Sequence, residues 1–250
     1  MLSLLLFKVL IFLCIVSPII LLFAKRNRAD KWKLVILFYG YYLLYQLLVH
    51  SVMLFPGIDL FSGYWNWSGK IYGILGSVGF LLIFGKEFTE NYFLRLKQKP
   101  GSLKINIIIL VVLTISSFIL SLSSQSGQRW DIESLMFQLT MPGIDEELAY
   151  RGIMLGILSS LLNGRLKIIN VNSGNPALLT TSILFGLIHG LKVKTGFELE
   201  FNIFYFLKTS VLGYVWGWMT LRSRSILLPM ISHNLMNFIG SLTLMIKYQI

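Results

Sequence analysis

The chain has 250 residues, of which 55% are hydrophobic and only 13% are charged. Soluble domains usually carry about a quarter charged residues, so this composition, with a mean hydropathy of +0.72, excludes an ordinary soluble domain. The formal net charge is +11. This positive charge does not indicate a nucleic-acid-binding protein, because no basic segment is interleaved with base-stacking aromatic residues. Lysine and arginine collect in the cytoplasmic loops of membrane proteins, so we expect a lipid bilayer, and no nucleic acid, as the partner of this chain.

Apolar runs of about 18 or more residues recur along the sequence, and such a run is long enough to cross a hydrocarbon core about 30 Å thick. The first run, 2–24, is too long for the core of a signal peptide, and no small-residue cleavage site follows it, so we expect a retained span. The predicted fold class is all-α, a polytopic bundle of about eight transmembrane spans. The predicted helices are 2–24, 33–55, 71–85, 105–122, 135–162, 176–191, 201–221 and 226–246.

Basic residues alternate from loop to loop. The first, third, fifth and seventh loops hold 14 lysines and arginines, whereas the other loops and the tails hold five. By the positive-inside rule, we predict that the odd-numbered loops are cytoplasmic and that both termini lie outside, which requires an even number of spans. The loops are too short to fold alone, so residues 1–250 are predicted to form a single integral-membrane domain.

The fifth predicted helix contains Pro142 and Gly143. Proline lacks a backbone donor and clashes with the preceding turn, so we expect a kink or an interruption here. A new helix is predicted to begin near Asp145. Asp145 would then be a good N-cap.

Glu146, Glu147 and Arg151 follow at the head of this new helix. Glu147 and Arg151 are four residues apart, so they share a helix face in the order that favours an ion pair. Glu146 points about 100° away from Glu147. We therefore expect Arg151 to neutralise Glu147, and Glu146 to remain free for chemistry. The alternative is purely structural, because acidic residues also favour helix N-termini.

Two histidines lie in later apolar segments. The segment 185–190 places Phe185 and His189 on one helix face, and its two glycines allow another helix to approach closely. His233 and Asn237 are also four residues apart, so they project from the same face of one helix. Each histidine has an alternative interpretation as an ordinary hydrogen-bonding contact between helices.

Taken together, three helices would supply a carboxylate, an imidazole, and an imidazole with an amide. These groups can activate water, hold an oxyanion and protonate a leaving amine. Ionisable groups at bilayer depth are costly and indicate a functional site by default. Other intramembrane protease chemistries fit worse, because the chain lacks the His-Glu-x-x-His, Gly-x-Gly-Asp and Gly-x-Ser-Gly motifs.

This ordered set of polar residues resembles the three-motif signature of type II CAAX prenyl endopeptidases and of their prokaryotic relatives, the CPBP intramembrane proteases. The three motifs are Glu146-Glu147-x-x-x-Arg151, Phe185-x-x-x-His189 and His233-x-x-x-Asn237. They occur in order in a motif-bearing half at about 131–250, whereas the first four predicted spans resemble the family only in being hydrophobic. The resemblance implies an intramembrane endopeptidase whose substrate is a peptide or protein, prenylated or not.

Carried over position by position, the resemblance also implies residue roles. Glu146 and His189 would polarise the attacking water, and His233 and Asn237 would stabilise the tetrahedral oxyanion. Glu147, Arg151 and Phe185 would support the site.

The resemblance leaves the cofactor open, since both a metalloprotease and a metal-free, glutamate-activated water have been proposed for the family. Glu146, His189 and His233 would offer zinc two nitrogens and a carboxylate, which is a known catalytic set.

Two further classes of function are compatible with the sequence. The first is a non-catalytic membrane scaffold or bacteriocin-immunity protein that retains the fold. The second is an ion-coupled or proton-coupled transporter that uses the same carboxylate and histidines as a relay. The intact motif set disfavours the scaffold, and the lack of inverted repeats disfavours the transporter.

Overall fold

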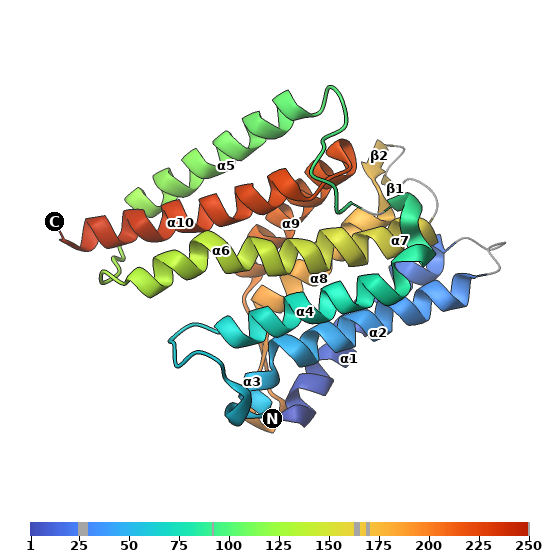
Figure 1. Cartoon of the computed structure of the whole chain (residues 1–250), viewed down its shortest axis with the longest axis horizontal. Helices are drawn as coiled ribbons and strands as arrows, with labels where there is room; N and C mark the ends of the chain where they lie inside the picture. The colour runs from blue at the N-terminus through green and yellow to red at the C-terminus, as the bar shows by residue number, and fades with distance from the viewer. Residues whose placement is uncertain (25–29, 92, 163–165, 169–170, 250) are drawn as a thin grey trace.

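The computed structural model describes residues 1–24, 30–91, 93–162, 166–168 and 171–249. Most of these residues are helical, which confirms the predicted all-α class (Figure 1). The long helices are α1 (Leu2–Phe23), α2 (Lys31–Val49), α4 (Trp67–Phe84), α5 (Leu103–Ser123), α6 (Ile132–Glu147), α8 (Pro176–Gly190), α9 (Ile203–Ser223) and α10 (Leu227–Gln249). The shorter ones are α3 (Ser51–Leu54), α7 (Leu155–Leu161), the 3₁₀ turns η1 (Pro56–Ile58), η2 (Gly85–Asn91) and η4 (Thr195–Phe197), and the π-helical η3 (Leu148–Met154).

Two antiparallel β-hairpins were not predicted. The first pairs β1 (Leu166–Ile168) with β2 (Val171–Gly174), and the second pairs β3 (Leu191–Val193) with β4 (Leu199–Phe201). Each strand has only three or four residues, which is too short for an alternating pattern to be recognised in the sequence. The second hairpin joins α8 to α9.

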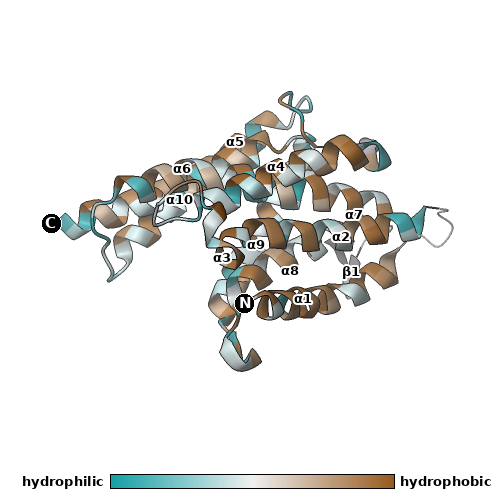
Figure 2. Ribbon diagram, turned by 60° about the horizontal axis from the view of Figure 1, so that its bottom comes forward, coloured by the Kyte–Doolittle hydropathy of each residue, from teal (hydrophilic) through white to brown (hydrophobic). Residues whose placement is uncertain are grey.

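Four helices among the described residues are long and apolar enough to cross a membrane by length and composition alone. They are α1, α2, the segment Trp67–Phe88 and α5. Helix α8 is also apolar but has only 15 residues, which corresponds to about 22 Å. The hydropathy colouring of Figure 2 shows hydrophobic residues along most of α1 and hydrophilic residues at the C-terminal end of α10. Helices α6, α9 and α10 are less apolar along their length, and they contribute to the polar site described below.

Helix α6 lies between two groups of helices. It packs against α4 on one side and against α10 on the other, while α2 packs on α4 and α5 packs on α10 (Figure 1). Helices α8 and α9 form an extensively packed pair. The buried core is centred on η3 and α7, where residues 148–158 are all buried. The polar residues of η3 are therefore held in the middle of the bundle.

The odd-numbered loops meet at one end of the bundle. The Lys99 N–H donates to the Ser223 carbonyl at 2.8 Å, which joins the third loop to the seventh. Ala24 and Leu162 form an isolated antiparallel bridge, which joins the first loop to the fifth. The basic loops therefore lie on one side, and their cytoplasmic orientation stays a prediction.

Helix α6 runs through Pro142 without a break, so the predicted restart near Asp145 is wrong. The reason is a side chain from α10. The Asn234 amide donates to the Thr140 carbonyl at 3.0 Å, and its oxygen accepts the Gly143 N–H at 2.6 Å. One amide thus satisfies backbone groups on both sides of the proline. Asp145 is a fully buried helical residue and not an N-cap.

The prediction of close packing at the two glycines of α8 is confirmed. A Cβ atom at Gly190 would lie 2.6 Å from the Phe206 Cβ, and one at Gly186 would lie 2.8 Å from the Phe206 carbonyl oxygen. Real Cβ atoms do not approach other atoms this closely, so only glycine lets α8 and α9 pack at this distance. This contact fixes the end of α8 that carries His189.

Candidate active site

The residues of the three motifs come together around one cavity of about 620 Å³. Glu146, Phe185, His189, His233 and Asn237 line it. They come from three helices that are well separated in the sequence, α6, α8 and α10. The two other motif residues lie behind this wall and are completely buried: Glu147 is 0% exposed and Arg151 is 1% exposed.

Arg151 occupies the π-helical segment η3, in which the Leu155 N–H bonds to the Tyr150 carbonyl five residues earlier. Its guanidinium lies 3.1 Å from Glu147 Oε1, as the i,i+4 spacing predicted. The carbon of the guanidinium is also 4.3 Å from the centre of the Phe185 ring. Arg151 therefore compensates a buried carboxylate while an aromatic face covers it.

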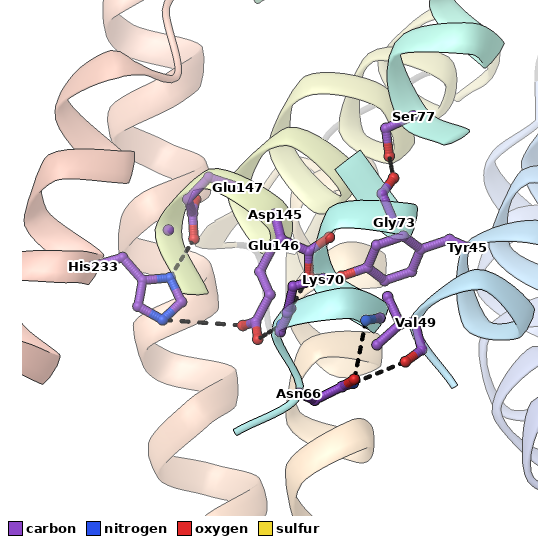
Figure 3. A network of polar contacts seen from close by, with 12 residues as sticks. Tyr45, Val49, Asn66, Lys70, Gly73, Ser77, Asp145, Glu146, Glu147 and His233 are labelled. Atoms are coloured by element: carbon purple, nitrogen blue, oxygen red, sulfur yellow. Dashed lines mark hydrogen bonds and ion pairs between the residues drawn. The ribbon is translucent and has the colours of Figure 1, made fainter. Parts of the chain in front are cut away.

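His233 is oriented by Glu147 and by an aromatic side chain. Its Nδ1 lies 2.9 Å from Glu147 Oε1 (Figure 3), and its ring stacks on Trp216 with centroids 4.1 Å apart and planes 16° apart. Glu147 thus accepts from His233 as well as pairing with Arg151. As a result, the other ring nitrogen, Nε2, is directed towards Glu146, at 4.0 Å from its Oε2.

His189 is oriented differently. Its Nδ1 lies 2.8 Å from the Phe185 carbonyl oxygen. A carbonyl can only accept, so Nδ1 must carry the proton of this hydrogen bond. In the neutral ring, Nε2 then keeps its lone pair. The ring faces the cavity and packs against the Phe185 side chain, with centroids 4.7 Å apart.

Two residues that the sequence did not single out, Lys70 and Tyr45, contact Glu146 and Asp145. Lys70 Nζ lies 2.6 Å from Glu146 Oε1 and 2.8 Å from Asp145 Oδ2, and the Tyr45 hydroxyl donates to the same Asp145 oxygen at 2.8 Å (Figure 3). The expectation that Glu146 is free is therefore wrong for one of its oxygens. Its Oε2 has no hydrogen-bond partner among the described residues. Asn234, which bridges Pro142, is the third missed residue.

The predicted third helix began at residue 71, one residue after Lys70, so Lys70 seemed to be a loop residue. The structure instead begins α4 at Trp67. Asn66, the N-cap, accepts the Gly69 N–H at 3.1 Å, and an Asn four residues before the lysine is the signal that would have extended the helix.

The zinc set considered from the sequence does not fit this arrangement. No group of three His, Cys, Asp or Glu side chains within the described ranges is placed to hold a metal ion. The Lys70 ammonium also occupies Glu146 Oε1, at 2.6 Å. We therefore derive no step through a metal.

The fold and the cavity define an α-helical membrane protein with an acid–histidine site inside its bundle. Residues 128–239 match the family described as type II CAAX prenyl endopeptidase, Rce1-like, and the matched part of the chain contains all three motifs. The resemblance predicted from the motifs is thereby confirmed. No curated protein and no solved structure matches the chain significantly. The family is one of membrane-integral proteases of the CAAX type, and the four long apolar helices of this chain agree with a multi-pass membrane protein.

Proposed function

We propose that this protein hydrolyses a peptide bond of a membrane-associated peptide or protein by means of a water molecule held between Glu146 and His189. The observation that carries the proposal is that two acceptors without a hydrogen-bond partner among the described residues line the same cavity. Glu146 Oε2 has no hydrogen-bond partner among the described residues, although His233 Nε2 lies 4.0 Å away. His189 lines the same cavity, and its Nε2 is left free because Nδ1 bonds to the Phe185 carbonyl. Two acceptors are what a water needs in order to present its lone pair to a carbonyl carbon.

Two further residues of the cavity, Asn237 and His233, suit the oxyanion. The Asn237 side chain lines the cavity and makes no hydrogen bond to another side chain or backbone group among the described residues. His233 directs Nε2 inward because Nδ1 faces Glu147. An Nε2–H donor requires the imidazolium form, in which Nδ1–H donates to the Glu147 carboxylate. Two donors fixed before the reaction would stabilise the developing oxyanion without reorganisation.

In the proposed reaction, Glu146 carries one proton from the water to the leaving amine. The water oxygen bonds to the carbonyl carbon as its proton passes to Glu146 Oε2. The tetrahedral intermediate collapses, the carbon–nitrogen bond breaks, and the leaving amine takes the proton from Glu146. Lys70 holds the other oxygen of Glu146 in place throughout.

The test is cleavage of a fluorescence-quenched CAAX-type peptide, farnesylated on its cysteine, by purified protein in detergent. Glu146→Gln and His189→Ala are expected to lower kcat by at least about 100-fold without reducing membrane accumulation. Glu87→Gln serves as the matched control, because Glu87 pairs with exposed Lys33 away from the cavity. Full activity of both site variants would contradict the proposal.

The same peptide without its farnesyl group separates two substrate classes. CAAX-type processing predicts a preference for the prenylated peptide, and processing of an unprenylated peptide, such as a bacteriocin leader, predicts none. The scaffold alternative requires no catalysis. It therefore predicts that Glu146→Gln supports full biological function in a complementation assay.

A further inference from the structure

One face of α9 forms a continuous wall of the active-site cavity. Tyr205, Lys208, Thr209, Leu212 and Trp216 all line it, at the three- and four-residue spacing of a helix face. One end of this face is Trp216, which stacks on His233. The other end carries Lys208, so the lysine and the proposed oxyanion site lie along the same wall.

Lys208 is the cation of this cavity that has no acidic partner among the described residues. Lys70 forms ion pairs with Asp145 and Glu146. Lys208 makes no ion pair or side-chain hydrogen bond with any described residue, and its side chain is exposed. Glu200, in the strand β4 that precedes α9, is paired with Lys194 at 2.7 Å. Since a charge within an apolar helix of a membrane protein usually has a partner or a function, Lys208 in α9 is a candidate for a role at the cavity.

The cavity continues past Lys208 towards the outer helices. A second cavity of about 640 Å³ lies between α5 and α9, and Lys208, Tyr205 and Leu212 line both. The other residues of the second cavity are mainly leucines and serines, and it contains no acidic residue. Lys208 therefore lies where the two cavities meet and is the positive charge that an entering ligand would encounter.

The separation along α9 suggests what Lys208 binds. Trp216 and Lys208 are eight residues apart, or about 12 Å along the helix axis. Side chains tilt towards the helix N-terminus, which carries the lysine ammonium farther from His233. An extended peptide covers about 3.3–3.6 Å per residue, so three or four residues span this separation.

We propose that Lys208 binds the C-terminal carboxylate of the substrate, three or four residues beyond the cleaved bond. This inference rests on the proposed peptide hydrolysis at Glu146. Cleavage near a free C-terminus is already implied by CAAX-type processing; the new element is that Lys208 would supply that selectivity, because an internal segment offers no carboxylate at this distance. The peptide would run along α9 with its C-terminal side towards Lys208, since its amino terminus would be repelled there.

The test compares the farnesylated peptide with its C-terminal amide, which removes one charge and little else. Wild-type protein is expected to cleave the carboxylate form roughly 10- to 100-fold more efficiently in kcat/KM, the range of a charge-assisted hydrogen bond. Lys208→Met should lower the rate for the carboxylate form to that for the amide. Lys208→Arg should keep most of the preference. Lys192→Met is the matched control, because it removes an exposed charge on β3 outside the cavity.

Binding to the Glu146→Gln variant, measured by fluorescence anisotropy with the same two peptides, separates this inference from the proposed function. Selective binding of the carboxylate form without cleavage by wild type would refute the hydrolysis and keep the subsite. Equal binding and equal cleavage of both forms would overturn the subsite and leave the hydrolysis intact. If Lys208→Met weakened binding of both forms equally, Lys208 would contact a lipid phosphate or the peptide chain, and the carboxylate assignment would be wrong.

Discussion

Replacing Lys70 by methionine tests whether the cluster of α4 and α6 is held by charge compensation. The variant keeps most of the side-chain volume but leaves Asp145 and Glu146, which are 0% and 8% exposed, without their shared cation. At the observed separations of 2.8 and 2.6 Å, each pair is worth about 6 kcal/mol at an effective dielectric constant of about 20. Burial of the ammonium costs several kcal/mol in return.

The expected net loss of unfolding free energy is about 3–5 kcal/mol, which is typical when one partner of a buried pair is removed. For a chain of this size, that corresponds to a fall of roughly 10 °C in Tm. The measurement is thermal unfolding in detergent, followed by tryptophan fluorescence. Lys70→Met/Asp145→Asn should recover part of the loss, because it removes one of the two uncompensated charges.

Lys33→Met provides the control. Lys33 also makes a close ion pair, 2.6 Å from Glu87, but the two side chains are 52% and 33% exposed, so the loss should stay below about 1 kcal/mol. If Lys70→Met unfolded at the same temperature as Lys33→Met, the cluster would not be a buried charge-compensated network and our account of Glu146 would be refuted.

Two other changes probe the framework of the site in the same unfolding assay. Arg151→Met should lower the free energy of unfolding by about 3–5 kcal/mol, since it leaves the fully buried Glu147 without its cation. Adding Glu147→Gln should restore much of that loss. An undiminished Tm in the single variant would contradict this account. Asn234→Ala should cost about 1–3 kcal/mol for each backbone group it leaves unsatisfied beside Pro142. Asn234→Asp, which keeps only the acceptor for Gly143, should fall between the alanine variant and wild type, and equal stability of all three would refute the bridge.

The positions of the helices were largely predictable from the sequence. Long apolar runs determine them locally, because a helix in a bilayer satisfies its own backbone and needs only a continuous apolar surface. The motif residues were also recognisable, since charged and polar groups are conspicuous in such runs. Their family was confirmed over residues 128–239, while their catalytic roles stay predictions.

Local rules failed where distant residues intervene. Pro142 predicted an interruption because proline disrupts an isolated helix, yet Asn234, 92 residues later in the chain, satisfies the adjacent backbone groups. Glu146 was expected to be free because no cation on its own helix faces it, yet Lys70 from α4 reaches it.

The sequence by itself therefore determined an all-α membrane bundle, the i,i+4 pairing of Glu147 with Arg151, and the short list of residues able to do chemistry. These depend on hydropathy and on helical spacing within one segment. Only the tertiary structure decided which oxygen of Glu146 is held, how each histidine is turned, and that Lys208 shares a cavity wall with Trp216. Such features depend on which helices pack together, and that is a property of the whole chain.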